Sequence, residues 1–205
     1  MCRVSSPRWL VFLCCVVSVC LSACAATAPV SPELATCMTH HDRFTRYDNG
    51  TVLDTCTHLM WMTQDYRNIE GKAPNSWPVA MAWAVTINQQ CYGGYSDWRV
   101  PTLEEYKTVY MPEERKRSHN DKAVGYPGGF ADGCGVWCWT REVSVYGVDG
   151  SLGAHAHEAY TFNFSNGRTL SRWANAHRFD RANEFTGSVR LVRGPLSTSM
   201  LPAAK

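Results

Sequence analysis

The sequence lacks the short motifs of several common enzyme classes. It has no Gly-x-Ser-x-Gly nucleophile elbow, no Gly-rich phosphate-binding loop and no His-Glu-x-x-His metal-binding helix. It also lacks an excess of charge of one sign, because 20 lysines and arginines face 18 aspartates and glutamates. Serine hydrolases, P-loop nucleotide hydrolases and zinc peptidases are therefore not expected, and a near-neutral chain is poorly suited to bind nucleic acid through bulk charge.

A long apolar run is present at the N-terminus, where residues 9–21 (WLVFLCCVVSVCL) follow Arg3 and Arg8. A basic start and an apolar run of this length are typical of a secretory signal, and the run is too short to span a bilayer. The sequence LSAC, ending at Cys24, resembles the bacterial lipobox. The resemblance implies that residues 1–23 are removed and that lipid chains on Cys24 anchor the protein to a membrane. The alternative is an ordinary signal peptide with an accidental cysteine.

The mature chain is predicted to hold a single domain. Residues 24–36 are small and contain prolines, which is typical of a tether, and residues 195–205 are interpreted as a flexible tail. The folded domain is therefore expected at residues 37–194, a length sufficient for one hydrophobic core. Loss of Arg3 and Arg8 with the signal peptide leaves 18 basic and 18 acidic residues, so the mature protein is neutral. Ala25, in place of an aspartate, favours the outer membrane.

The cysteine count is uneven after processing. Of ten cysteines, four lie in the signal peptide and Cys24 is assigned to the lipid. An oxidising compartment favours disulfides among the rest, and the odd number leaves at least one thiol free or bonded to another chain. Cys37 lies close enough in sequence to fold back to Cys56, but sequence does not determine the connectivity. The disulfide candidates are Cys37, Cys56, Cys91, Cys134 and Cys138.

Two Asn-Gly pairs predict two β-hairpins. A two-residue turn at Asn49-Gly50 would pair Tyr47 with Val52 and set Arg43 opposite Cys56. The second turn, at residues 166–167, follows aromatic residues at alternating positions 160, 162 and 164. Further strands are expected over residues 59–62, 136–140 and 188–194, the last as one continuous strand.

Two helices are predicted early in the chain. The first has Val79, Trp83 and Ile87 on one face, and Gly93 or Gly94 would end it. The second is expected over residues 103–110, where residues 102 and 105 have the spacing of a capping box. Two helices among antiparallel hairpins predict an α+β fold.

The link between the two helices carries the sequence SDWRVP. Asp97, Trp98 and Arg99 stand side by side there, just before Pro101. Such a group could form a site, but we interpret it as scaffold. The tryptophan is predicted to fill the core, while the aspartate and arginine are predicted to bind loop backbone or each other.

The order of these segments resembles the Lcl C-terminal domain family, named for the end domain of a bacterial collagen-like adhesin. The resemblance covers residues 44–194 through DNGTVLDTCTHLMWM, GYSDWRVPTLEEY, VWCWT, YTFNFSNGR and VRLVRG. It implies a C-type lectin-like fold, distantly similar to formylglycine-generating enzymes, with a twisted antiparallel core, two helices and long loops. It also implies an envelope or surface protein that binds a ligand, and it offers no catalytic residues to carry over. We expect no metal and no cofactor. The signature residues are Asn49, Gly50, Trp61, Asp97, Trp98, Arg99 and Pro101.

A basic and aromatic segment, GRTLSRWANAHRFDR, is the candidate ligand surface. Guanidinium groups beside aromatic rings suit sulfated or carboxylated glycans, because the cations bind the anions and the rings stack on sugars. The alternative is that residues 172 and 173 merely cap the core. The calcium-dependent sugar signatures of lectins, such as Glu-Pro-Asn, are absent. The candidate residues are Arg168, Arg172, Trp173, His177, Arg178 and Arg181.

Two weaker candidates would make the protein an enzyme. Cys134 and Cys138 could form a thiol pair, as the distant enzyme relatives use, although a structural disulfide explains them more simply. His155 and His157, with Glu158, could bind a metal, but they lie in a Gly-rich segment typical of a solvated loop. We therefore expect a non-enzymatic outer-membrane lipoprotein, periplasmic or surface-facing, that binds an acidic glycan or a protein partner. The alternatives are a structural component of an envelope complex and a thiol- or metal-dependent enzyme.

The lipid anchor is testable by mass spectrometry of the mature protein taken from membranes. We expect an N-terminal peptide that begins at an acylated Cys24, because the lipobox directs both cleavage and lipidation at that residue. Alkylation of thiols before reduction should also reveal one free or mixed-disulfide cysteine. A mature chain without lipid would contradict the predicted membrane location.

Overall fold

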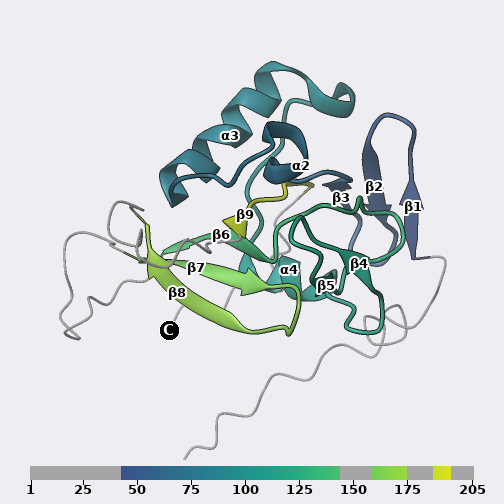
Figure 1. Ribbon diagram of the computed structural model, residues 1–205. Helices are drawn as coiled ribbons and strands as arrows, with labels where there is room; N and C mark the ends of the chain where they lie inside the picture. Colours follow the sequence, from purple (N-terminus) through teal and green to yellow (C-terminus); the bar gives the residue numbers. More distant parts are fainter. Residues whose placement is uncertain (1–42, 144–157, 175–186, 195–205) are drawn as a thin grey trace, which may run out of the picture. The chain divides into compact units, whose positions relative to one another are not determined.

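The computed structural model describes residues 43–143, 158–174 and 187–194 (Figure 1). These residues form an α+β fold with mainly antiparallel sheets, which confirms the predicted fold class. In chain order the elements are β1 Phe44–Arg46, β2 Thr51–Asp54, β3 Leu59–Met62, α2 Tyr66–Glu70, α3 Trp77–Gln89, the 3-10 turn η1 Tyr92–Gly94, α4 Leu103–Thr108, β4 Lys116–Arg117, β5 Ala123–Val124, β6 Trp137–Val143, β7 Glu158–Asn163, β8 Thr169–Trp173, β9 Gly187–Ser188 and β10 Val192–Arg193.

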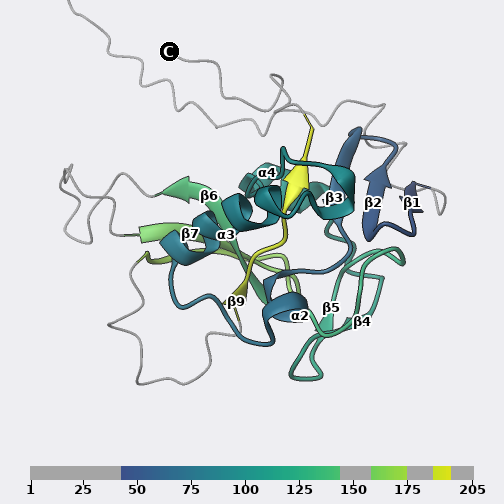
Figure 2. The same ribbon diagram turned by 90° about the horizontal axis from the view of Figure 1, so that it is seen from above.

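Two four-stranded sheets dominate the described residues. The first has the order β1-β2-β3-β10 and the second the order β8-β7-β6-β9, in which only β9 runs parallel to its neighbour. Helix α3 packs against the second sheet, and β9 lies near the centre of the view in Figure 1. Strand β10 lies beside β3, as Figure 2 shows from above. A small hairpin, β4-β5, occupies a stretch for which no element was predicted.

The first hairpin forms where predicted, but its register is shifted by one residue. Phe44 pairs with Asp54, and Tyr47 donates its amide to the Thr51 carbonyl at 2.9 Å, so the loop has three residues and not two. A two-residue loop would need positive φ at both turn positions, and of the Asn-Gly pair only Gly50 has it, at 84°. Asn49 instead turns its side-chain oxygen back to accept the Thr51 hydroxyl at 2.7 Å, a local bond that stabilises the longer loop.

The second hairpin also has a longer loop than predicted. Asn163 and Gly167 are joined by a backbone hydrogen bond of 2.8 Å, so residues 164–167 form the turn. The reason is Phe164, which leaves the ladder and enters the core, where its ring stacks on Tyr126 with 3.9 Å between centroids. Phe162 and Phe164 are both buried and in contact, at 4.9 Å, as their alternation predicted.

The two predicted helices are present as α3 and α4, and the short α2 was not predicted. Ser76 caps α3 with its side chain, and the buried face consists of Ala80, Trp83, Ala84 and Ile87. Val79 was expected on that face but is exposed. The helix ends at Gln89, before the predicted glycines, which belong to the turn η1. Helix α4 begins with the predicted capping box and ends two residues early, at Thr108.

The predicted last strand is divided between the two sheets. Strand β9 pairs with β6, strand β10 pairs with β3, and residues 189–191 cross between them. Val189, Arg190 and Leu191 are all fully buried, so the crossing has no exposed face, and the prediction of one continuous strand is wrong. Tyr106 receives the Arg190 amide and donates its hydroxyl to the Arg190 carbonyl, both at 3.1 Å. The last segment of the chain therefore joins the two halves of the core.

A buried ion pair secures the start of the domain. Arg43 and Asp54 are joined by two hydrogen bonds of 2.6 and 2.5 Å, and neither side chain reaches solvent. Asp54 also accepts the Thr57 hydroxyl and the Cys56 amide. Each carboxylate oxygen thus accepts two hydrogen bonds.

Replacement of Asp54 should be strongly destabilising. Asp54→Ala leaves the Arg43 guanidinium buried without its counter-charge, and we expect the free energy of unfolding to fall by about 3–5 kcal/mol in denaturant titrations. Lys107→Ala is the matched control, because its ion pair with Glu104 is about half exposed on both sides and should change stability by less than about 0.5 kcal/mol. Equal effects of the two substitutions would contradict the importance of burial.

Candidate functional site

Two of the signature residues, Asn49 and Gly50, contact a segment about 40 residues further along the chain, the turn η1. Asn49 donates its side-chain amide to the Gly93 carbonyl at 2.8 Å, and the Tyr92 hydroxyl donates to the Gly50 carbonyl at 3.1 Å. A Cβ atom on Gly93 would stand 2.7 Å from the methyl group of Thr51. The hairpin turn and the turn η1 therefore pack closely, with a side chain of each bonded to a backbone carbonyl of the other.

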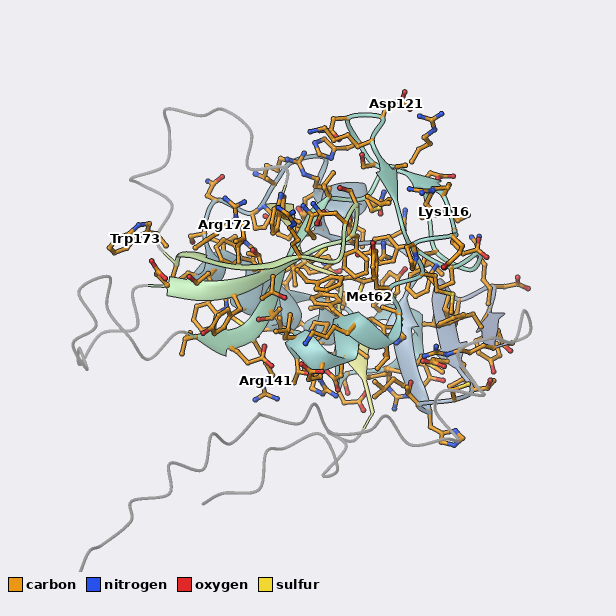
Figure 3. All side chains as sticks on the ribbon, turned by 90° about the horizontal axis from the view of Figure 1, so that it is seen from below. Met62, Lys116, Asp121, Arg141, Arg172 and Trp173 are labelled. Atoms are coloured by element: carbon orange, nitrogen blue, oxygen red, sulfur yellow. The ribbon has the colours of Figure 1, made fainter. Side chains whose placement is uncertain are left out.

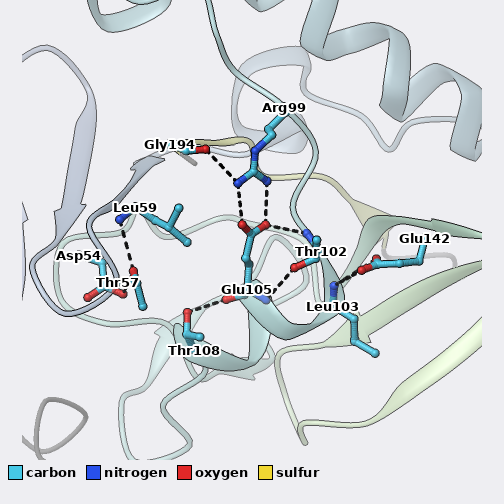
Figure 4. Close-up of polar contacts among 10 residues, drawn as sticks. All are labelled: Asp54, Thr57, Leu59, Arg99, Thr102, Leu103, Glu105, Thr108, Glu142 and Gly194. Carbon is cyan, nitrogen blue, oxygen red and sulfur yellow. Dashed lines mark hydrogen bonds and ion pairs between the residues drawn. The ribbon is translucent and has the colours of Figure 1, made fainter. Parts of the chain in front are cut away.

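Arg99 is the centre of a second structural contact, shown in Figure 4. Its guanidinium forms two hydrogen bonds with the Glu105 carboxylate, at 2.8 and 2.6 Å, and a third with the Gly194 carbonyl at 3.2 Å. Glu105 also accepts the amide of Thr102 and so completes the capping box of α4. The arginine thus ties the start of α4 to the end of β10.

Asp97 and Trp98 complete the scaffold. The Trp98 ring is 2 % exposed and donates its indole NH to the Tyr92 carbonyl, so it fills the core as predicted. The expected pair between Asp97 and Arg99 does not form: the Asp97 carboxylate pairs instead with Arg193, at 2.6 and 3.1 Å. These hydrogen bonds lower the pKa of the Asp97 carboxyl below its usual value. The SDWR segment is therefore held by contacts with β10 and α4, which are those of a scaffold.

The surface around β8 gathers part of the predicted arginine and aromatic group. We call the β8 surface the set Trp137, Arg168, Arg172 and Trp173. The Arg172 guanidinium lies over the Trp137 ring, 4.5 Å from its centroid, and partial burial lowers the pKa of Arg172. Arg168 is exposed, and Trp173 is half-buried beside Glu158, its partner in the β7-β8 register. Figure 3 shows Arg172 and Trp173 at the β8 side of the fold, well apart from Lys116 and Asp121.

The remaining members of that group cannot be placed. His177, Arg178 and Arg181 lie outside the described residues, as do His155 and His157. Sequence reasoning also missed Trp137, the ring beneath Arg172, because it belongs to another strand and no local pattern links the two positions. Within the described residues, no group of three or more His, Cys, Asp or Glu side chains is arranged to hold a metal ion.

The cysteines differ from the expected disulfide framework. Cys91, Cys134 and Cys138 carry free thiols, which is contrary to the pairing considered for them. Cys56 is disulfide-bonded, and none of those three is its partner, while Cys37 lies outside the described residues. Burial raises the pKa of Cys134 to about 12 and that of Cys138 still further, so both remain thiols at neutral pH. A protonated thiol is a poor nucleophile and a poor metal ligand, which weighs against the alternative of a thiol-dependent enzyme that uses Cys134 and Cys138.

Thiol reactivity should separate the three free cysteines. We expect iodoacetamide at pH 8 to alkylate the exposed Cys91 in the folded protein, while Cys134 and Cys138 react only after unfolding, because burial keeps them protonated and inaccessible. Peptide mapping by mass spectrometry checks this. The raised pKa values of both buried thiols also predict an effect of pH on stability. Because the folded protein keeps these protons above the ordinary pKa of 9.0, whereas the unfolded chain loses them, the free energy of unfolding should fall as pH rises from about 9 toward 12. Below about pH 9 the two thiols should have no such effect. Alkylation of Cys138 in the native state would contradict the predicted burial.

The comparison with protein families agrees with the resemblance that the signature residues carry. The model of the Lcl C-terminal domain family matches residues 50–193, more than two thirds of the chain. No curated protein and no solved structure matches the chain. Among the described residues, no helix has the length and apolar character needed to cross a membrane. The family match indicates an envelope-associated, adhesin-like domain, and we conclude that this chain belongs to the Lcl C-terminal domain family.

Proposed function

We propose that the protein is a non-enzymatic lipoprotein of the outer membrane whose domain binds an anionic glycan at the β8 surface. The observation that carries the proposal is the stacking of Arg172 on Trp137 at 4.5 Å, beside the exposed Arg168. An aromatic ring beneath a guanidinium restricts its orientation without neutralising it. A guanidinium held in this way is a suitable group to bind a sulfate or carboxylate.

The aromatic side chains supply the second half of the recognition. Leu170 lies between the two arginines on their face of β8 and is 47 % exposed, and the ring that contacts Arg172 is Trp137. Trp173 follows Arg172 directly, so it faces the other side of the strand. Sugar rings present apolar faces that stack on such groups, while their acidic substituents bind the arginines. Glu158 is the one carboxylate directly opposite this strand in the register, next to Trp173. Because Glu158 lies at the Trp173 end of β8, it does not offset the positive charge of Arg168 at the other end.

The membrane location rests on the N-terminal sequence. The LSAC sequence at Cys24 supports lipidation, and the envelope-associated family supports export. A lipid anchor and a tether would present the domain at the membrane surface, which suits recognition of an extracellular or periplasmic polymer.

A protein partner in a structural envelope complex is the second candidate. Cys91 favours it, because this thiol is exposed and free in a protein that we assign to an oxidising compartment. A mixed disulfide with another envelope protein would account for the odd cysteine. Non-reducing electrophoresis of membranes would show such a species, and Cys91→Ser would remove it.

Heparin, a sulfated glycan, provides the test of the β8 surface. The double variant Arg168→Ala with Arg172→Ala should elute at lower salt and bind at least about tenfold more weakly, because two charge-assisted contacts are lost. The matched control is Arg115→Ala with Arg117→Ala, which removes the same charge from exposed positions at the β4-β5 hairpin and should leave retention close to that of the unaltered protein. Equal loss in both double variants would indicate non-specific charge, and unchanged retention in the first would exclude the β8 surface. Circular dichroism spectra should show that both double variants remain folded.

A further inference from the structure

The two hairpin turns of the fold each contain an Asn-Gly pair, and both turns require the glycine. Gly50 and Gly167 have positive φ, at 84° and 73°. A Cβ atom at Gly50 would stand 2.5 Å from the Tyr92 hydroxyl, and one at Gly167 would stand 2.8 Å from the Tyr110 ring. A larger residue is therefore strained and crowded at either position. The fold thus keeps two asparagines whose next residue has no side chain.

An asparagine before glycine can lose its side-chain amide to the backbone. The nitrogen of the glycine gives its proton to water and attacks the asparagine Cγ. A bond between that nitrogen and Cγ forms, the bond between Cγ and Nδ2 breaks, and Nδ2 takes a proton and leaves as ammonia. Water then opens the resulting five-membered ring and yields aspartate or isoaspartate, so one water is consumed, one ammonia is released and nothing is oxidised. Glycine favours the reaction because no side chain hinders the approach of its nitrogen.

The first turn is held in a geometry that opposes this reaction. Asn49 donates its Nδ2 to the Gly93 carbonyl at 2.8 Å, and its Oδ1 accepts the Thr51 hydroxyl at 2.7 Å. The Gly50 carbonyl accepts the Tyr92 hydroxyl at 3.1 Å. Both the leaving nitrogen and the attacking residue are therefore bonded to the turn η1. Ring closure would require these hydrogen bonds to break together, which raises the barrier.

The second turn has fewer restraints. Asn166 is exposed, and within the described residues its Nδ2 has no hydrogen-bond partner, while its Oδ1 accepts the Arg168 amide at 3.1 Å. That bond does not oppose the reaction, because a donor at Oδ1 stabilises the negative charge that develops there during attack. The Gly167 amide donates to the Asn163 carbonyl at 2.8 Å, and this bond in a surface turn must open first. The corresponding amide of Gly50 donates at 3.3 Å, so the contrast rests on the side chains of the two asparagines.

The geometry points to Asn166 as a site of deamidation in the folded protein that weakens anion binding at the β8 surface, whereas Asn49 is protected. The product carries a carboxylate two residues before Arg168. This effect on binding rests on the proposed function, because a negative charge beside Arg168 opposes the approach of an anionic glycan. Water is the only co-reactant, so the fraction of altered protein grows with the time since the molecule folded.

Peptide mapping of the full chain tests the site. The folded protein is incubated at pH 8 in water labelled with heavy oxygen, and conversion of each asparagine is followed by mass spectrometry. Asn166 should convert at least about tenfold faster than Asn49, because Asn49 must first lose its tertiary hydrogen bonds. In denaturant the two rates should become nearly equal, since both sites are then free Asn-Gly pairs. Equal rates in the folded protein, faster conversion of Asn49, or an intact Asn166 would overturn the proposal.

Heparin chromatography tests the effect on the β8 surface. Asn166→Asp fixes the charge of the product and should elute at lower salt than the unaltered protein. The matched control is Asn120→Asp, which adds the same charge at an exposed position of the β4-β5 hairpin and should leave elution nearly unchanged. Equal shifts in both variants, or no shift in Asn166→Asp, would overturn the effect on binding. If heparin does not retain the unaltered protein, the proposed function fails and this effect with it, whereas the deamidation site is decided by the peptide map alone.

Discussion

The buried guanidinium of Arg190 holds together the region where the two sheets meet. It has no exposed surface, and it donates to the carbonyl oxygens of Met62 and Thr63 at the end of β3. It also lies over the adjacent rings of Tyr126 and Phe130, 4.5 and 4.8 Å from their centroids. A cation so far from water is costly unless it is surrounded by carbonyl oxygens, π faces and opposite charge. Its position in the crossing segment means that these groups can surround it only when both halves of the fold are in place.

The same kind of constraint acts on several of the signature residues, whose contacts are those of a scaffold. Asn49, Asp97 and Arg99 each link segments that are far apart in sequence: Asn49 joins the first hairpin to the turn after α3, while Asp97 and Arg99 join the SDWR segment to β10 and the residue that follows it. Such contacts limit the substitutions that the fold tolerates at those positions. Fewer contacts of this kind limit substitution at the β8 edge and on the outer side of α3. Binding specificity in such a fold is most readily altered on the second kind of surface.

Local patterns predicted local structure well. The capping box of α4, the cap of α3 and the location of both turns follow from residues within a few positions of one another. The hairpin registers did not follow, because Asn49 bonds to its own strand and to Gly93, and because the core takes Phe164 out of the second ladder. The division of the last strand depends on two partners, β6 and β3, that no local pattern reveals. For the candidate site, the sequence supplied Arg168, Arg172 and Trp173 but not Trp137, since tertiary packing alone brings that ring under Arg172.

The position of β10 in the first sheet affects when the domain can fold during its synthesis. Its pairing partner β3 is made early, yet β10 is among the last segments of the domain to leave the ribosome. Until then β3 lacks one neighbour and the pocket of aromatic rings lacks its cation, so long-range closure must wait for the end of synthesis. A chain that cannot complete its core until synthesis ends stays unfolded until then. An export channel that accepts only unfolded chains requires this of the proteins that it transports.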